Sequence, residues 1–390
     1  METEEVFEGL WTCFTKFGFK SSRAFDLLIQ NYLANKSVLD GVLVLQRMKD
    51  CAMVPEPRSV SAIHNGLLRI RRHDVVLKLW EDALALKAKP DMHILSAVIQ
   101  SFCELKRFEE AKEIFSQFEA DIVLYNILIH GLCKSKRMQE AMEIKNALHS
   151  KGLEPDVVTY CTLILGLSKS EKHELAHQTI DEMLELGLIP SEAALSSVVE
   201  GLRKDQKLGT AFSLLQKTSK LGSMPNLFVC NALLSSLCKN GFFEEAEAIF
   251  NDLGRLSNDI AYSIMIDSFS RRGKLDNALS FLRKMDTSGV RMTVYPYNSL
   301  INGYCKCGDM VSAERMYSEM MSLRIQPTVV TYTSLIAGYS NNGQLNKAFD
   351  LYREMLAKNI SPNVFSFTAL ISALCRGSRM EEAVRLFNTM

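Results

Sequence analysis

Proline recurs through this 390-residue chain at an almost constant interval. Seven of the nine prolines lie 35 residues, or close to a multiple of 35, from the one before. They are Pro55, Pro90, Pro155, Pro190, Pro225, Pro327 and Pro362. An alanine keeps nearly the same period at Ala111, Ala141, Ala176, Ala211, Ala246, Ala278, Ala313, Ala348 and Ala383. A period of this length restricts the chain to a repeat architecture, in which each unit buries its apolar face only by stacking on its neighbours.

The repeat also predicts the domain organisation. If each unit is counted from the second residue after its proline, eleven units begin at residues 22, 57, 92, 122, 157, 192, 227, 259, 294, 329 and 364. Residues 22–390 form the predicted array, whose last unit is incomplete. Residues 1–21 carry Val6, Leu10, Trp11 and Phe14 at helical spacing, and we expect a capping helix or a degenerate earlier unit there. Because the sequence stops inside a second helix, we expect a fragment or a chain that another element continues.

Each unit has the pattern of two helices joined by a turn. Positions 7 and 8 are apolar, as in Leu128-Ile129, and apolar residues return three or four residues later. Position 15 is a glycine in four units, where glycine can end a helix in the left-handed conformation: Gly241, Gly273, Gly308 and Gly343. Acidic residues then open a second helix, as their charge suits the dipole there. The sequence predicts an all-α solenoid of about eleven stacked helical hairpins.

The composition excludes several other classes of protein. Hydrophobic residues make up 47% and charged residues 23% of the chain, which excludes a disordered or collagen-like protein. Lys plus Arg equals Asp plus Glu at 45 each, so a polyanionic partner would have to bind a local arrangement of charge. No apolar stretch approaches the roughly 18 residues of a membrane span, and we expect no membrane partner. The acidic start, Met1 to Glu5, does not resemble a transit peptide.

Five of the ten cysteines recur at position 12 of a unit. They are Cys103, Cys133, Cys238, Cys305 and Cys375. The chain has no CxxC pair and no signal peptide, so disulfides and a zinc site are not indicated. We predict that these five are reduced thiols in the core.

Two segments at the start of a unit are nearly alike: Val157-Val158-Thr159-Tyr160-Cys161-Thr162-Leu163-Ile164-Leu165-Gly166-Leu167 and Val329-Val330-Thr331-Tyr332-Thr333-Ser334-Leu335-Ile336-Ala337-Gly338-Tyr339. Both look like the first helix of the pentatricopeptide repeat, which is typical of a family of plant organelle RNA-binding proteins. The whole unit is similar to the 35-residue P-type (P-class) motif, and the resemblance covers residues 22–390. The alternative, the 34-residue tetratricopeptide repeat, has a Trp, Leu-Gly and Tyr signature that is missing here. The resemblance implies a right-handed solenoid.

The resemblance also implies a function. Members of the family read single-stranded RNA at one base per repeat, and positions 5 and 35 of a unit face the base edge. The position-5 residues here are Ser61, Ser96, Asn126, Cys161, Ser196, Asn231, Ser263, Asn298, Thr333 and Thr368. The corresponding position-35 residues are Asp91, Asp121, Asp156, Ser191, Asn226, Asn258, Thr293, Thr328 and Asn363, and Thr368 has none. Residues at position 2, which sandwich the base in the family, are Val123, Val158, Ala193, Phe228, Ile260, Tyr295, Val330 and Phe365.

The chemistry of such a code predicts a target. Uracil and guanine carry a ring N–H that needs an acceptor such as Asp, whereas cytosine and adenine need a donor such as Asn. A short hydroxyl at position 5 leaves room for a purine, and Asn reaches a pyrimidine. With the family's polarity, the units from residue 57 onward predict 5′-GGUNAYRYAR-3′. Asn126/Asp156, Ser196/Asn226 and Thr333/Asn363 follow the pattern best, Cys161/Ser191 is unassigned, and Asp26/Glu56 departs from it.

Position 13, at the end of the first helix, carries a cation in eight units. The eight are Arg69, Lys134, Lys169, Lys204, Lys239, Arg271, Lys306 and Arg376. On stacked units they would form a stripe suited to the RNA phosphates. The alternative is that each cation only complements the dipole at the end of its helix.

Two further motifs have simpler explanations. The aromatic residue at position 4, as in Tyr160 and Tyr332, is expected to pack between helices rather than stack on a base. His173-Glu174-Leu175-Ala176-His177 matches HExxH, a zinc-protease motif, but Ala176 is the recurrent alanine and no third ligand is apparent. We therefore predict no metal, no cofactor and no enzymatic activity.

The sequence thus predicts a monomeric protein that binds single-stranded RNA and acts by occupying it, together with protein factors of RNA processing. The family implies mitochondria or chloroplasts, with mitochondria preferred. The alternative function is a helical-repeat scaffold that binds a peptide.

Overall fold

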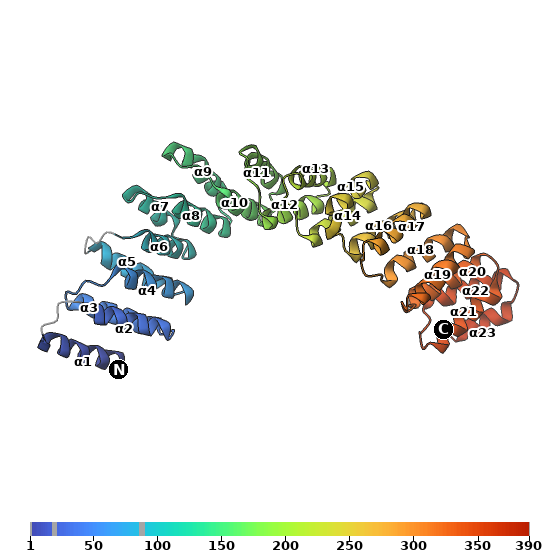
Figure 1. Cartoon of the computed structure of the whole chain (residues 1–390), viewed down its shortest axis with the longest axis horizontal. Coiled ribbons are helices and arrows are strands. Elements are labelled where there is room, and N and C mark those ends of the chain that lie inside the picture. Colours follow the sequence, from blue (N-terminus) through green and yellow to red (C-terminus); the bar gives the residue numbers. More distant parts are fainter. Residues whose placement is uncertain (1, 18–21, 86–89, 390) are drawn as a thin grey trace. The chain divides into compact units, whose positions relative to one another are not determined.

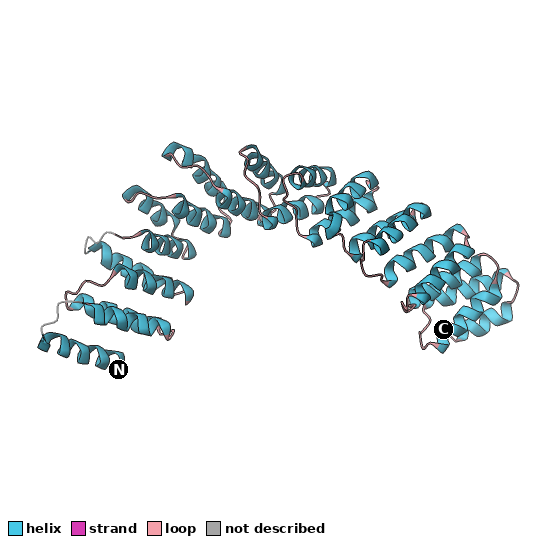
Figure 2. Ribbon diagram, viewed as in Figure 1, coloured by secondary structure: helices cyan, strands magenta, loops and turns pink. Residues whose placement is uncertain are grey.

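The structure is a computed structural model that describes residues 2–17, 22–85 and 90–389. Within these ranges the chain forms only helices and no strand (Figure 2). The predicted all-α class is confirmed. None of the described helices is long and apolar enough to cross a bilayer.

Eleven helices are the first helices of the predicted units. They are α2 (Arg23–Ala34), α4 (Pro57–Arg69), α6 (Met92–Glu104), α8 (Ile122–Lys134), α10 (Val157–Lys169), α12 (Glu192–Lys204), α14 (Leu227–Asn240), α16 (Asp259–Arg271), α18 (Val294–Cys307), α20 (Val329–Asn341) and α22 (Val364–Arg376). All but α2 begin at the first residue of a predicted unit. The period of the sequence therefore marks the start of a helix.

The other long helices follow these in turn as second helices. They are α3 (Val38–Asp50), α5 (His73–Ala85), α7 (Phe108–Gln117), α9 (Met138–Leu148), α11 (His173–Glu185), α13 (Leu208–Ser219), α15 (Phe243–Leu253), α17 (Leu275–Thr287), α19 (Met310–Ser322), α21 (Leu345–Ala357) and α23 (Met380–Asn388). Two short 3-10 helices, η1 (His149–Lys151) and η2 (Gly254–Leu256), extend α9 and α15.

Contacts divide the chain into two compact parts, residues 1–198 and residues 199–390, and the boundary falls inside α12. In the first part, α4, α6, α8 and α10 each pack on the preceding first helix (Figure 1). In the second part, α16, α18, α20 and α22 do the same. Ten of the eleven first helices, all but α12, also pack against their own second helix within the described residues, so these ten units are helical hairpins.

The core of a unit comes from the periodic apolar positions. In the unit that starts at residue 157, Tyr160, Leu163, Ile164 and Ala176 are all fully buried. The position-4 aromatics of the other units are buried as well: Phe25, Tyr125, Tyr262, Tyr297, Tyr332 and Phe367. The prediction that position 4 belongs to the core is confirmed.

The turn between the two helices has the same backbone conformation in every unit. Position 15 has φ between 57° and 92° in all eleven units. Gly241, Gly273, Gly308 and Gly343 hold it in four, as predicted. The other seven units place a non-glycine residue there: Lys36, Arg71, Lys106, Lys136, Glu171, Gln206 and Ser378. The hairpin geometry therefore overrides the local preference of these residues.

The recurrent cysteines fill the contact between successive first helices. A Cβ atom added to Gly166 would lie 2.7 Å from the Cβ of Cys133, and one added to Gly338 would lie 2.7 Å from the Sγ of Cys305. Position 10 must therefore stay small where position 12 of the preceding unit is a cysteine. Burial raises the pKa of the Cys103, Cys133 and Cys305 thiols to about 12, so they stay protonated.

The prediction of five core thiols is confirmed for four of the five. Cys103, Cys133, Cys238 and Cys305 are buried, but Cys375 is exposed. The prediction for Cys375 was wrong because none of the described first helices packs on α22 after α20, so position 12 is not covered.

The amino-terminal helix α1 (Glu2–Phe17) packs on α3, the second helix of the first hairpin. Phe7 is buried, and the rings of Trp11 and Phe14 lie 6.4 Å and 5.7 Å from the ring of Phe25. Val6, which the helical spacing placed on the packed face, is instead exposed, because Phe7 occupies the contact. Residues 18–21 of the predicted 1–21 segment lie outside the described residues.

Candidate nucleic-acid interface

Positions 5 and 35 meet at the junction between successive units. Position 35 is the residue just before the next first helix, and position 5 lies one turn into the first helix of its own unit. Hydrogen bonds join the two side chains in five pairs: Ser61/Asp91 (2.8 Å), Asn126/Asp156 (3.1 Å), Asn231/Asn258 (3.3 Å), Asn298/Thr328 (3.3 Å) and Thr333/Asn363 (3.3 Å). In a sixth pair, the Ser191 backbone N–H donates to the Cys161 Sγ at 3.5 Å. The fold thus joins side chains about 30 residues apart in the sequence.

Most position-35 residues also cap the next helix. The side-chain oxygen accepts a backbone N–H three residues on in Asp91 (2.8 Å), Asp121 (3.0 Å), Asp156 (2.8 Å), Asn226 (3.0 Å), Asn258 (3.0 Å) and Asn363 (2.9 Å). An N-cap of this kind stabilises a helix by about 1 kcal/mol. Because a helix N–H can only donate, the cap turns an oxygen toward the helix. An Asn then directs its NH2 group away from the helix, and an Asp directs its second oxygen away.

The charge state of Asp156 follows from these contacts. Partial burial alone would raise the pKa of this carboxyl. Hydrogen bonds from the Thr159 backbone N–H, the Thr159 hydroxyl and the Asn126 amide outweigh burial and hold the pKa below its usual 3.8. Asp156 is therefore ionised at neutral pH and acts only as an acceptor.

Two predicted pairs are not joined in the described part of the chain. The Ser96 hydroxyl donates to the Met92 carbonyl oxygen at 2.7 Å rather than to Asp121. The Ser263 hydroxyl likewise donates to the Asp259 carbonyl oxygen at 2.6 Å, and the buried Thr293 Oγ1 has no partner. In both of these units the serine hydroxyl is instead satisfied by a carbonyl oxygen of its own helix.

The remaining predicted position-5 residues differ in exposure. Ser196 is buried, whereas Thr368 is exposed and donates to the Val364 carbonyl oxygen at 2.7 Å. In the first unit, Asp26 is 2% exposed and accepts the Glu56 backbone N–H at 3.0 Å. Its carboxylate is thereby used within the protein, in line with the departure of this unit from the sequence pattern.

Position 2 carries exposed apolar side chains. Exposed fractions are 53% for Val123, 57% for Val158, 78% for Phe228, 53% for Ile260, 70% for Tyr295, 56% for Val330 and 74% for Phe365, and Ala193 is exposed as well. These residues lie in the first turn, two residues after the cap and two before the buried position 4. In each of the two parts of the chain, exposed apolar side chains thus recur next to polar pairs, which makes position 2 a candidate binding surface rather than part of the core.

The eight position-13 cations fall into two groups. Arg69, Lys169, Lys239 and Lys306 are exposed and form no ion pair with other described residues. The other four are engaged within the protein. Lys134 pairs with Glu104 at 2.5 Å, Arg271 with Asp267 at 2.7 Å and Lys204 with Glu200 at 3.8 Å, and Arg376 donates to the Ser340 carbonyl oxygen at 3.0 Å. The first group is therefore the better placed to bind phosphate.

Position 3 carries residues that the sequence analysis did not select. The hydroxyls of Thr159 and Thr331 are buried and lie 2.6 Å from the amide oxygens of Asn126 and Asn298 in the preceding units. The sequence feature that could have pointed to position 3 is the segment Val-Val-Thr-Tyr, which occurs in both units. Its role could not be seen from one unit alone, since the partner lies 33 residues away.

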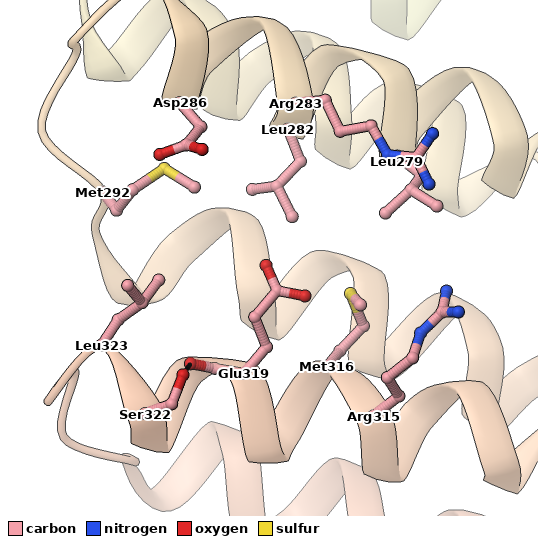
Figure 3. Close-up of a pocket in the computed structure, with 10 residues that line it drawn as sticks. All are labelled: Leu279, Leu282, Arg283, Asp286, Met292, Arg315, Met316, Glu319, Ser322 and Leu323. Atoms are coloured by element: carbon pink, nitrogen blue, oxygen red, sulfur yellow. Dashed lines mark hydrogen bonds between the residues drawn. The ribbon is translucent and has the colours of Figure 1, made fainter.

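The structure also has a hollow of about 370 Å³ between α17 and α19 (Figure 3). Leu282 and Met316 contribute its apolar wall, and Arg283 and Glu319 are among its charged residues. The Glu319 carboxylate accepts the Tyr297 hydroxyl at 2.9 Å. All but one of the residues that line it lie on second helices or directly after one, so it is a gap in that layer and not part of the row formed by positions 2, 5 and 35.

The HExxH histidines lie on α11. His177 Nε2 is 3.5 Å from the Asp181 carboxylate of the same helix. Within the ranges that the structure describes, no group of three His, Cys, Asp or Glu side chains could hold a metal ion.

Family models match most of the array. A PPR repeat family model matches residues 120–169, 292–338 and 327–376, and a PPR repeat model matches residues 94–121, 158–188, 228–257, 260–290 and 365–390. A pentatricopeptide repeat-containing protein of Arabidopsis thaliana is 48% identical over 87 residues, which are 22% of this chain and 10% of that protein. The match thus spans a small part of the length of that relative.

Similar solved structures include two RNA complexes. The maize pentatricopeptide repeat protein PPR10, with an 18-nt psaJ RNA element, has a TM-score of 0.42 and 21% identity over 97% of this chain and 61% of that chain. Yeast Rmd9p, with a 16-nt target RNA, has a TM-score of 0.40 and 14% identity over 99% of this chain and 87% of that chain. The two repeat models together cover more than half of the sequence, so this chain belongs to the pentatricopeptide repeat family.

Proposed function

We propose that this chain is a P-class pentatricopeptide repeat protein that binds single-stranded RNA at one base per unit. The observation that carries the proposal is the row of hydrogen-bonded pairs at positions 5 and 35, which lies beside the exposed apolar residues at position 2. Polar pairs at a regular spacing can read base edges, and apolar side chains between them can stack on base faces.

The pair Asn126/Asp156 supports a specific base. The Asn126 oxygen faces the Thr159 hydroxyl at 2.6 Å, and one amide hydrogen is given to Asp156 Oδ1. A second amide hydrogen and the second carboxylate oxygen of Asp156 remain to meet RNA. Together they offer one donor and one acceptor, which match the ring N–H and the adjacent carbonyl of uracil. Cytosine presents two acceptors there and would meet the carboxylate unfavourably.

The other pairs extend this argument. In Asn231/Asn258, the caps leave amide donors at both positions, which suits the acceptor edge of cytosine within the predicted pyrimidine letter. In Asn298/Thr328, the position-35 hydroxyl can donate or accept, so this unit accepts either pyrimidine. The proposed target remains 5′-GGUNAYRYAR-3′, with the amino-terminal units at the 5′ end.

We propose that the protein acts by occupying this segment in mitochondria or chloroplasts. Bound RNA would be protected from nucleases or held open for translation, processing or splicing factors. The net charge of the chain is zero, so phosphate contacts depend on local cations such as Arg69, Lys169, Lys239 and Lys306.

Binding of the purified chain to short oligonucleotides tests the proposal. The predicted RNA is compared with a base-scrambled RNA and with the matching DNA at two salt concentrations. We expect a preference for the predicted RNA of ten-fold or more, about 1.4 kcal/mol, with weaker binding at high salt. Equal, weak binding to all three would reject RNA reading and favour the peptide-binding scaffold.

A further inference from the structure

Two buried threonines at position 3 each contact an asparagine of the preceding unit. Thr159 Oγ1 lies 2.6 Å from Asn126 Oδ1, and Thr331 Oγ1 lies 2.6 Å from Asn298 Oδ1. Both threonines are fully buried. Each therefore lies behind a base-facing residue, where it can act on RNA only through that residue.

The direction of these hydrogen bonds follows from the neighbouring backbone. The Asp156 N–H donates to Thr159 Oγ1 at 3.2 Å, and the Thr328 N–H donates to Thr331 Oγ1 at 2.9 Å. A backbone N–H can only donate, so each hydroxyl accepts there and keeps its own hydrogen. Thr331 gives this hydrogen to Asn298 Oδ1, whereas Thr159 shares it between Asn126 Oδ1 at 2.6 Å and Asp156 Oδ1 at 2.9 Å. The amide oxygen is thereby turned inward, and the NH2 group is turned toward position 35 and the surface.

Thr159 and Thr331 differ in how far each controls the orientation of its asparagine amide. At Asn126, the neighbour Asp156 accepts only, so the carboxylate and Thr159 both require the same amide orientation. At Asn298, the neighbour is the Thr328 hydroxyl, at 3.3 Å, which can donate or accept. Only Thr331 then determines which end of the Asn298 amide faces the surface.

A third unit lacks the hydroxyl and serves as an internal comparison. Position 3 is Ala261 where the preceding unit carries Asn231. Asn231 Oδ1 is buried and has no hydrogen-bond partner among the described residues. Within that part of the chain, the Asn231 side-chain amide is held through the 3.3 Å hydrogen bond to Asn258 Oδ1 alone.

We propose that Thr331 and Thr159 are positioning residues for base recognition, and that each fixes which half of the preceding asparagine amide faces the RNA. This inference rests on the proposed RNA-reading function. It assigns part of the specificity of one unit to the unit that follows. With Thr331 present, Asn298 offers a donor to the carbonyl oxygen shared by both pyrimidines. With the amide reversed, its oxygen would repel that same carbonyl.

The main test measures the Kd of four RNAs that differ only at the eighth letter of the target, opposite Asn298. Wild type should prefer U and C over A and G. Thr331→Val keeps the side-chain volume and removes the hydroxyl, and we expect its affinity for the pyrimidine RNAs to fall by about five- to ten-fold. Thr331→Ser restores the hydroxyl and should restore the preference.

A matched control removes a similarly buried hydroxyl elsewhere. Thr218 in α13 is fully buried and donates only to carbonyl oxygens of its own helix. Thr218→Val should leave the base preference unchanged, so a general loss of packing is separated from a loss of amide orientation. The converse variant, Ala261→Thr, should sharpen the pyrimidine preference at the sixth letter.

A second readout does not depend on RNA. In protein labelled with 15N-asparagine, the side-chain amide signals of Asn298 are assigned by their absence in Asn298→Asp. Thr331→Val should shift or broaden these signals, and Thr331→Ser should not. A folded Thr331→Val protein with unchanged amide signals and an unchanged base preference would overturn the inference. If wild type itself does not distinguish the predicted RNA from its scramble, the proposed function fails, whereas the amide signals still report on the positioning role.

Discussion

At the scale of single residues, one side chain performs two tasks. Asp156 caps α10 with Oδ1, which contributes to folding, and leaves Oδ2 for the proposed contact with RNA. The two tasks can be separated, because Asn is as good a cap as Asp. Substitutions at position 35 can therefore change the exposed group while the helix start is preserved.

Asp156→Asn tests this separation. The variant keeps an oxygen for the Thr159 N–H and presents an NH2 donor outward in place of an acceptor. We expect the preferred third letter to change from U to C, with a change in the U-to-C affinity ratio of ten-fold or more, about 1.4 kcal/mol. Kd values for the two RNAs measure it. Asp156→Ala, which loses the cap, should bind both weakly, and an unchanged U preference in Asp156→Asn would contradict the reading.

The ionisation of Glu354 predicts a pH dependence. Its carboxylate accepts the Tyr317 hydroxyl at 2.8 Å, the Tyr332 hydroxyl at 3.0 Å and the Lys358 ammonium at 2.8 Å. Burial alone would raise the pKa, but these hydrogen bonds outweigh it and lower the pKa from its usual 4.5. A lowered folded-state pKa stabilises the fold above the unfolded-state value, and this stability is lost as pH falls through the folded value.

Glu354→Gln should therefore be less stable than wild type above about pH 4.5, and the difference should shrink as the pH is lowered below that value. Thermal unfolding at pH 7, 4.5 and 3 measures the Tm difference. A difference that is constant over this range would show that the charge of Glu354 contributes nothing. Glu381→Gln, on α23, provides the control, because the Glu381 carboxylate is exposed and forms no ion pair with other described residues.

At the scale of the helices, close packing and turn geometry decide stability. Successive first helices approach so closely that glycine at position 10 faces cysteine at position 12. For Gly166→Ala, the added methyl group would meet Cys133 Sγ at 2.8 Å and Met138 Sδ at 3.1 Å. We expect a loss of about 1–3 kcal/mol in the free energy of unfolding, measured by urea denaturation.

Gly209→Ala is the matched control for that prediction. Gly209 also lies in a helix, α13, but a Cβ there has nothing within 4 Å. Alanine should then stabilise the protein by about 0.5–1 kcal/mol, because helical glycine loses more backbone entropy on folding. Equal effects of the two substitutions would argue against the close contact at Gly166.

The turn at position 15 offers a stabilising change. Glu171 has φ of 58°, a conformation that costs a side chain with a Cβ about 1–2 kcal/mol, and its charge lies at the carboxyl end of α10. We expect Glu171→Gly to raise stability by about 0.5–1 kcal/mol after the entropy of glycine in the unfolded chain is counted. The reverse change, Gly343→Ala at φ of 72°, should lower the stability. Urea denaturation measures the free energy of unfolding of both variants.

At the scale of the whole molecule, the charges cancel, so the affinity for RNA depends on where the cations are placed. Lys239 and Lys306 are exposed and free of ion pairs within the described residues, whereas Lys134 is held by Glu104. Each cation that contacts a phosphate adds about 0.7 to the slope of log Kd against log salt for a single strand.

Lys239→Ala combined with Lys306→Ala should therefore reduce that slope by about 1.4 and weaken binding of all RNAs alike. The base preference should not change, because phosphate contacts carry no sequence information. Lys134→Ala is the control and should change the slope less, since Glu104 already neutralises this cation. An unchanged slope in the double variant would indicate that position 13 only complements the helix dipole.

The sequence by itself determined the repeated hairpin, the starts of the helices and the buried position-4 aromatics. These features are local, because the residues that determine a helix period, a cap or a glycine turn all lie within one unit. The tertiary structure alone decided how units meet. It showed that the Thr331 hydroxyl lies 2.6 Å from Asn298 Oδ1, that Glu104 pairs with Lys134 and that Cys375 is exposed. Such contacts join residues about 30 positions apart, so they depend on the stacking of neighbouring units rather than on the pattern of any one of them.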